Sequence, residues 1–318
     1  MTTRYRMVAV AAIVVGLAVA TAGCGRYSVG ALKAQKAYKD ANELYRGSNW
    51  KDAAAKYEYV LKQNPERTEV YFFLANSYDN AYKPSRTGES ENDALIQKAI
   101  ENYRKAAEQD PSPDMKKLAM QYLVAAYGPD KLNDPTQAEP IVQEMIAIAP
   151  NDPGNYFALA RIYEDAGRYE EAEQALLKAR DTNPDDVTVY VQMSGFYNRQ
   201  GEFDKTMEAL HKAADIKPDD PQGHQLVAVY YQEKASKDPR LSNPKKIEYI
   251  DKGLAAGEKA LQLNPDYIDA MVFRNIMLRM KGNLESDLEK RKQLYDEADR
   301  LRNRAMALTA TKTGEGGK

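Results

Sequence analysis

The sequence predicts an all-α fold built from repeated helical hairpins, and three observations support this prediction. Prolines end successive apolar stretches at gaps of 46, 39, 34, 34 and 47 residues, and a period near 34 is typical of stacked helix pairs. Small and aromatic residues recur at similar offsets between these prolines. The 318 residues are 43% apolar and contain one cysteine, which excludes a disulfide framework. The prolines are Pro65, Pro111, Pro150, Pro184, Pro218 and Pro265.

Residues 1–23 are predicted to be a lipoprotein signal peptide that lies outside the repeat fold. Two arginines precede an apolar run at residues 7–20, which is shorter than the roughly 20 residues that a helix needs to span a bilayer. Thr21, Ala22 and Gly23 then lead to Cys24. This order resembles the lipobox of bacterial lipoproteins, although Thr21 stands where leucine is usual.

The resemblance implies that Cys24 is lipidated and holds the protein in the cell envelope, facing the periplasm. The protein would then carry a lipid anchor with palmitate-type acyl chains, and residues 24–30 would form a tether. Gly25 stands where aspartate commonly retains lipoproteins at the inner membrane, so the outer membrane is favoured in a Gram-negative host. Cleavage after Ala20 by an ordinary signal peptidase and an uncleaved anchor are the alternatives.

Residues 31–282 carry the repeat. Small residues at three recurring positions allow two antiparallel helices to approach closely, and large residues fill the space around them. One hairpin cannot bury its apolar face alone, so stacking supplies the core. In one repeat the pattern consists of Tyr156, Leu159, Ala160, Tyr163, Tyr169, Ala172, Leu176, Ala179 and Pro184. It is similar to the tetratricopeptide repeat, which implies a right-handed α-solenoid of about six to seven helical hairpins.

Two repeats contain insertions at the turn between their helices. The inserted loops are predicted at residues 82–89 and 234–242, with new helices beginning near Ser90 and Asn243. Insertions on one edge of a solenoid can bind partners, and tolerated surface length is the alternative.

The C-terminal segment is predicted to close the stack. Residues 283–308 show a helical apolar stripe, and Ser286 with Glu289 resembles a capping box. We therefore expect a C-terminal capping helix, followed by a disordered tail at residues 309–318.

The sequence indicates a protein without catalytic residues, metal ligands or cofactors. Lys and Arg number 45 against 47 Asp and Glu, so no basic stripe for nucleic acid is expected. No motif for zinc, dinucleotide or phosphate binding is present at a suitable place. The two histidines are interpreted as solvated (His211) and half-buried (His224). We therefore expect neither an enzyme nor a small-molecule substrate.

Tetratricopeptide arrays bind protein or peptide segments along their concave wall, and the resemblance places a set of side chains there. Asn42 and Asn76 could hold a peptide backbone because an amide both donates and accepts. Tyr38 and Gln121 stand where lysines of a carboxylate clamp would be, so capture of a C-terminal carboxylate is not expected. The predicted wall consists of Tyr38, Asn42, Tyr45, Phe72, Asn76, Asp79, Phe157, Arg161, Asp165, Asn198, Arg199, Gln225, Gln232, Arg279 and Met280.

The function predicted from these features is a lipid-anchored scaffold that mediates protein–protein interactions in the assembly of bacterial envelope complexes. The alternative is a regulatory accessory subunit of a cell-wall or polysaccharide export or processing enzyme complex. The residues do not identify the client protein.

Overall fold

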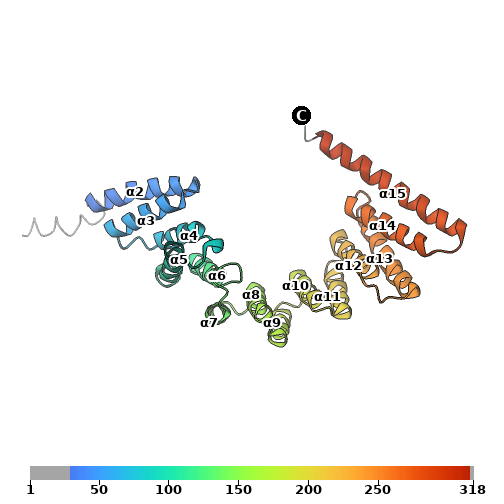
Figure 1. Cartoon of the computed structure of the whole chain (residues 1–318), viewed down its shortest axis with the longest axis horizontal. Helices are drawn as coiled ribbons and strands as arrows, with labels where there is room; N and C mark the ends of the chain where they lie inside the picture. Colours follow the sequence, from blue (N-terminus) through green and yellow to red (C-terminus); the bar gives the residue numbers. More distant parts are fainter. Residues whose placement is uncertain (1–28, 316–318) are drawn as a thin grey trace, which may run out of the picture. The chain divides into compact units, whose positions relative to one another are not determined.

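The computed structural model describes residues 29–315, and this part of the chain folds into α-helices without β-strands (Figure 1). The all-α class with repeated helix pairs is thereby confirmed. No helix among these residues is long and apolar enough to cross a membrane. The predicted signal peptide and Cys24 lie outside the described residues.

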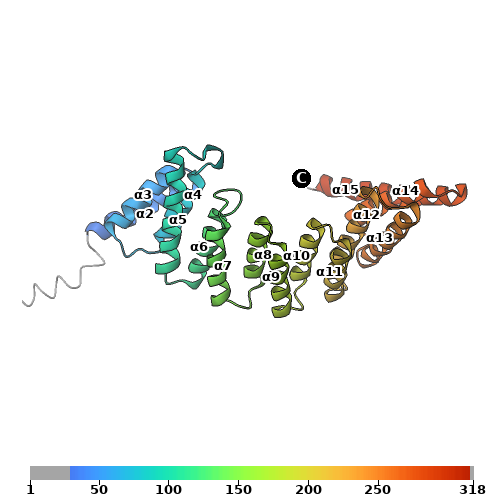
Figure 2. The ribbon, with the colours of Figure 1, turned by 60° about the horizontal axis from the view of Figure 1, so that its bottom comes forward.

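The chain divides into two compact units, with the boundary inside α8 (Pro153–Asp165). Up to Pro150 the N-terminal unit contains α2 (Val29–Arg46), α3 (Trp50–Gln63), α4 (Val70–Ala81), the 3₁₀ turn η2 (Pro84–Arg86), α5 (Ser90–Gln109), α6 (Pro113–Ala126) and α7 (Pro135–Ile148). After α8 the C-terminal unit contains α9 (Tyr169–Thr182), α10 (Val187–Arg199), α11 (Phe203–Ile216), α12 (Pro221–Lys237), α13 (Asn243–Leu263), α14 (Ile268–Leu284) and α15 (Leu288–Glu315). Within each unit, helices pack on their neighbours in sequence (Figure 2).

Short polar residues begin several of these helices. Asp186 and Asp220 accept hydrogen bonds from the backbone N–H groups of Thr188 and Gln222, at 2.8 and 2.9 Å. These carboxylates satisfy donors that have no partner inside the helix, and they face the positive end of its dipole. The second acidic residue after Pro184 and after Pro218 is therefore a helix cap.

The small residues of the repeat lie where the helices of a hairpin approach each other. In the first hairpin Ala41 and Ala53 are fully buried, and Tyr57 fills the space beside them. Ala172 and Ala179 of the C-terminal unit are also fully buried. The predicted packing roles of these positions are confirmed.

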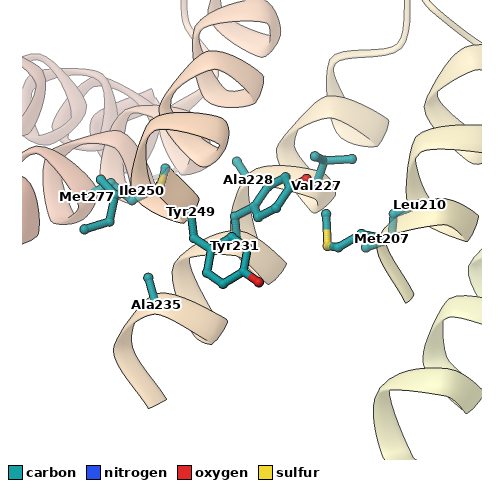
Figure 3. Packing of buried hydrophobic residues seen from close by; sticks show 9 residues of the cluster. All are labelled: Met207, Leu210, Val227, Ala228, Tyr231, Ala235, Tyr249, Ile250 and Met277. Carbon is teal, nitrogen blue, oxygen red and sulfur yellow. The ribbon is translucent and has the colours of Figure 1, made fainter. Parts of the chain in front are cut away.

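One hydrophobic core cluster of the C-terminal unit lies among α11, α12, α13 and α14 (Figure 3). Tyr231 of α12 lies between Met207 of α11 and Ile250 of α13 in this cluster, while Met277 contributes from α14. Met277 is fully buried and lies directly against Gly253 of α13. A side chain at Gly253 would occupy the space that Met277 now fills.

The first insertion, residues 82–89, is held by one buried side chain. Asn92 of α5 accepts a hydrogen bond from the N–H of Lys83 at 2.9 Å and donates to the carbonyls of Lys83 and Arg86 at 3.0 and 3.1 Å. Its amide thus replaces backbone partners that the loop cannot supply. The predicted position of this insertion is confirmed.

The second insertion is shorter than predicted. Helix α12 continues to Lys237, which leaves residues 238–242 as the loop before α13. Residues 234–237 contain no glycine or proline, whereas Asp238 precedes Pro239 and is therefore biased away from helical geometry. The prediction that the loop begins at Lys234 is wrong for this reason.

Both ends of the described fold extend beyond their predicted bounds. Val29 and Gly30, predicted as tether, already belong to α2. Helix α15 continues through residues 309–315 of the predicted tail, because no glycine or proline occurs before Gly314. Asp287 precedes the first residue of α15 and caps the helix, because its carboxylate accepts a hydrogen bond from the N–H of Glu289 at 2.9 Å. The expected cap at Ser286 is thus displaced by one residue.

Candidate protein-binding site

Three predicted wall residues of the N-terminal unit are buried. Phe72, Asn76 and Asp79 of α4 are only 5%, 5% and 6% exposed. The ring of Tyr122, from α6, packs edge-on against Phe72 at 5.3 Å between centroids. The prediction that these three side chains line an accessible surface is therefore wrong.

The amide of Asn76 is occupied by internal hydrogen bonds. Its oxygen accepts from the Tyr45 hydroxyl at 2.6 Å and from the Asn80 amide at 2.8 Å. Its nitrogen donates to the Tyr103 hydroxyl at 3.1 Å. Asn76 consequently connects three helices and is not available to hold a peptide backbone. The oxygen of half-buried Asn42 likewise accepts from the Tyr57 hydroxyl, at 2.6 Å.

Asp79 is the buried charge of this network. It accepts a hydrogen bond from the Tyr103 hydroxyl at 3.1 Å and forms an ion pair with Lys131, which lies between α6 and α7. The Asp79 side chain is 4% exposed, and that of Lys131 is 25% exposed. Burial, and then the charge of Asp79, raise the pKa of Tyr103 far above its ordinary value. Tyr103 therefore stays protonated and donates.

The other predicted residues of the N-terminal unit are more accessible. Tyr38 and Tyr45 are half-buried, and the Arg67 guanidinium lies 4.2 Å from the centroid of the Tyr38 ring. Arg161 and Asp165 are exposed and form an ion pair with each other at 3.0 Å.

In the C-terminal unit, one predicted wall residue is buried, and another forms an ion pair with the last helix. Gln225 is 5% exposed, and neither polar atom of its side chain has a hydrogen-bond partner within the described part of the chain. Arg279 donates to Asn275 at 3.0 Å and forms an ion pair with Asp299 of α15. The guanidinium that was predicted to face a partner protein thus contacts α15 of the same chain.

The remaining predicted residues of the C-terminal unit stay at least partly accessible. Asn198 and Arg199 are exposed at the end of α10. Phe157, Gln232 and Met280 are half-buried.

A surface pocket of about 360 Å³ brings Asn198 together with the second insertion. We call it the insertion pocket. It is formed by residues from α10, α11, α12 and the loop that follows α12. Its lining consists of Asn198, Phe203, Tyr230, Glu233, Lys234, Lys237, Asp238, Pro239 and Arg240.

Asp238 fixes the loop of the insertion pocket. Its carboxylate accepts hydrogen bonds from the backbone N–H and the guanidinium of Arg240, at 3.0 and 2.9 Å, and forms an ion pair with Lys234 at 2.9 Å. These partners, Arg240 first, hold the pKa of the Asp238 carboxyl well below its usual range. A lowered carboxyl pKa contributes stability above the unfolded value of about 3.9, and this contribution is lost only as the pH falls through the lower folded value. The loop contacts therefore persist at neutral and mildly acidic pH.

Aromatic side chains supply the apolar part of the insertion pocket. The Lys234 ammonium lies 5.1 Å from the centroid of the Phe203 ring, and the Phe203 ring packs edge-on against Tyr249 at 5.2 Å. Burial raises the pKa of Tyr230, so its hydroxyl stays neutral. The pocket offers apolar contact beside a surplus of positive charge.

Sequence reasoning placed only Asn198 of this lining on the binding wall. Tyr230 was missed because the repeat register assigns it no binding position. Lys237 and Arg240 fall within the insertion predicted at residues 234–242, which the sequence analysis named as able to bind partners. The insertion itself was the available signal, since it adds Arg240 next to Asn198 of the preceding repeat.

The two histidines have structural contacts. The Nε2 atom of exposed His211 lies 3.2 Å from the Tyr231 hydroxyl, and that of half-buried His224 lies 2.9 Å from the carbonyl of Pro218. Both exposures agree with the interpretation from the sequence. Among the described residues, no group of three His, Cys, Asp or Glu side chains could hold a metal ion.

Comparisons with known proteins agree with this architecture. Two segments, residues 38–81 and 131–190, match models described as tetratricopeptide repeat. The C-terminal part of a tetratricopeptide-repeat-containing protein from Cytophaga hutchinsonii superimposes with a TM-score of 0.54 at 16% identity, covering 88% of this chain and 99% of that one. This likeness shows a shared fold.

Two further solved structures match with lower scores. A tetratricopeptide repeat protein from Parabacteroides merdae gives a TM-score of 0.45 at 12% identity and covers 84% of this chain and 99% of its own. YrrB, described as a tetratricopeptide repeat protein with an unusual peptide-binding site, gives a TM-score of 0.40 at 19% identity. The match covers 62% of this chain and 90% of YrrB. No curated protein matches the sequence.

Proposed function

Because this chain is a tetratricopeptide-repeat protein, we propose that it is a lipid-anchored scaffold that binds segments of other proteins and assembles complexes of the bacterial envelope. Proteins of this family generally mediate protein–protein interactions and are generally not enzymes. The insertion pocket is the observation that carries the proposal for this chain, because it joins an exposed wall residue, Asn198, to a loop that the regular repeat lacks.

The lining of the insertion pocket favours an acidic partner segment with an apolar side chain beside its carboxylates. The lining holds three basic residues against Glu233 and Asp238. Lys237 pairs with Glu233 at 3.1 Å, and Lys234 and Arg240 share Asp238, so one positive charge is left without a carboxylate of its own. Opposite charge on the partner would speed association and fix its register. An apolar side chain next to the carboxylate could then pack against the aromatic part of the pocket.

Membrane attachment is the second part of the proposal, and it rests on the sequence alone. Cys24 is the only cysteine, and it follows a short apolar run and three small residues. One acyl chain binds a membrane only marginally, so an anchor that carries several chains is needed for stable attachment.

The pocket is tested by site-specific photo-crosslinking in the native host. A benzoylphenylalanine in place of Asn198 should give a discrete crosslinked protein, because this exposed position lines the pocket. Lys237→Glu in the same protein should abolish that crosslink, since it reverses the charge opposite the partner's carboxylate. Lys259→Glu, an exposed lysine of α13, is the matched control and should leave the crosslink unchanged. Equal crosslinking in both variants would refute the proposed charge recognition.

The anchor is tested by intact mass and membrane partitioning of the protein from its own host. The wild-type chain should lack its first 23 residues, carry a lipid mass and partition with membranes. Cys24→Ala should lose both the lipid and the partitioning. A lipid-free wild-type protein that still contains residues before Cys24, or one that is recovered with intact Met1, would contradict the anchor.

A further inference from the structure

The first helical hairpin exposes lysines that have no acidic partner. Lys33, Lys36 and Lys39 of α2 and Lys56 of α3 are exposed, and we call them the lysine face. Among residues 29–315 none of these four forms an ion pair. By contrast, Lys205 of α11 lies within 3.0 Å of carboxylate oxygens of Glu173 and Glu202.

The charge of this hairpin is opposite to that of the remaining chain. Helices α2 and α3 contain 7 basic and 4 acidic residues, whereas residues 64–315 contain 34 basic and 43 acidic residues. The whole-chain net charge of -2 therefore hides a basic end and an acidic body. Charge asymmetry of this kind is typical of a surface that binds anions.

The lysine face also has the shape and the apolar groups for contact with a lipid surface. A groove of about 510 Å³ lies between α2 and α3, lined by Lys33, Lys36 and Lys56 with Tyr59, and Asp40 is the one acidic residue of its lining. Near the start of α2, Val29 and Leu32 are exposed by 69% and 62%. Such an arrangement combines cations for phosphate groups with apolar side chains that can enter the headgroup region.

Chain length places this hairpin beside the predicted anchor. Four residues separate Cys24 from Val29, which makes five steps along the chain, and an extended chain spans at most about 3.6 Å per step. The first residue of α2 therefore lies within about 18 Å of a lipidated Cys24 in any conformation of the linking residues. The attraction of lysines to an anionic leaflet acts over a Debye length, which is about 8–10 Å at physiological salt.

We infer that the lysine face of the first hairpin binds the anionic phospholipid surface of the membrane that holds the protein. This inference rests on the proposed anchor, because the anchor brings the face to the membrane. The acyl chains and the lysines then both contribute to membrane binding. The hairpin is attracted to the anionic leaflet, whereas the acidic residues 64–315 are repelled from it.

Vesicle binding by the chain without its lipid tests the inference. Residues 25–318 retain every described helix, so this protein is expected to fold. It should bind phosphatidylcholine vesicles that contain about 30% phosphatidylglycerol and should bind pure phosphatidylcholine vesicles far less. Each lysine near an anionic surface contributes about a fivefold increase in partitioning. The variant Lys33→Glu/Lys36→Glu/Lys56→Glu should therefore bind at least about 100-fold less.

A matched variant controls for net charge. Lys178→Glu/Lys217→Glu/Lys259→Glu changes the same number of exposed lysines in the C-terminal unit and should bind like the wild type. Equal loss in both variants, or equal binding of the wild type to both vesicle types, would overturn the inference. It would also be overturned if the wild type formed a salt-sensitive dimer without vesicles that the lysine-face variant lacked, because the face would then bind a second copy. The unlipidated protein carries no anchor, so failure here leaves the mass test of Cys24 unaffected.

Discussion

Replacing Lys131 by methionine should lower the free energy of unfolding of the N-terminal unit by about 3 kcal/mol. Lys131 pairs with Asp79, whose side chain is only 4% exposed. Removing one partner of a buried ion pair leaves an uncompensated charge, which costs about 3–5 kcal/mol, and the partial exposure of Lys131 favours the lower end of that range. Methionine keeps most of the apolar stem, so packing changes little.

Urea unfolding followed by fluorescence measures this effect locally. The only tryptophan, Trp50, lies in α3 with its ring 5.2 Å from Tyr45, so its signal reports on the N-terminal unit. Lys105→Met is the matched control: its ion pair with Glu101 is exposed and contributes less than about 0.5 kcal/mol. A neutral residue 79 should remove the penalty, so the double variant Asp79→Asn/Lys131→Met should recover stability. A similar loss of stability in Lys131→Met and in the control Lys105→Met would contradict the buried-charge explanation.

The same substitution, glycine to alanine, should have opposite effects at Gly253 and at Gly195. A Cβ at Gly253 would lie 2.6 Å from the Met277 sulfur and 3.2 Å from the Tyr231 Cβ, inside the packed core of the C-terminal unit (Figure 3). Overpacking of this kind costs typically 1–3 kcal/mol, and the better helix propensity of alanine offsets about 1 kcal/mol. We therefore expect Gly253→Ala to destabilise the unit by up to about 2 kcal/mol.

Gly195 of α10 meets only the Arg199 guanidinium, at 3.3 Å. That flexible group can move, so Gly195→Ala should stabilise the protein by up to about 1 kcal/mol. Thermal unfolding followed by circular dichroism should separate the two variants by several degrees in opposite directions from the wild type. If Gly253→Ala were as stable as Gly195→Ala, α13 and α14 would not be as closely packed as the structure indicates.

The repeat architecture could be predicted because each packing position depends on residues within one hairpin. Ala41 and Ala53 are small because two helices touch there, and this local requirement is visible in the sequence. The loop at residues 82–89 could be placed by counting the residues between successive repeat positions. An insertion increases this spacing but leaves the pattern of the two helices unchanged. Helix ends were predicted less well, since residues 309–315 have no strong preference against helix.

The binding wall could be predicted only in part, because accessibility depends on neighbouring repeats. The repeat register gives the direction of Asn76 and Asp79, but Tyr122 and Lys131 of the irregular third repeat cover this part of α4. Arg279 lies at the expected position of its repeat, but its guanidinium forms an ion pair with Asp299 of α15. The lysine face was missed because its charge cancels in the composition of the whole chain.

The packing of helices on their sequence neighbours has a consequence for how the chain folds. Contacts between residues close in sequence form quickly, because little loop-closure entropy must be overcome before they form. Each hairpin can therefore pack as soon as it and its neighbouring hairpin have been synthesised or have crossed a membrane, without waiting for the C-terminus. The pair of Asp79 with Lys131 is an exception, since it joins residues 52 positions apart. The charge of Asp79 is neutralised only after the third hairpin arrives, so the order of emergence also sets the order in which the N-terminal unit gains its stability.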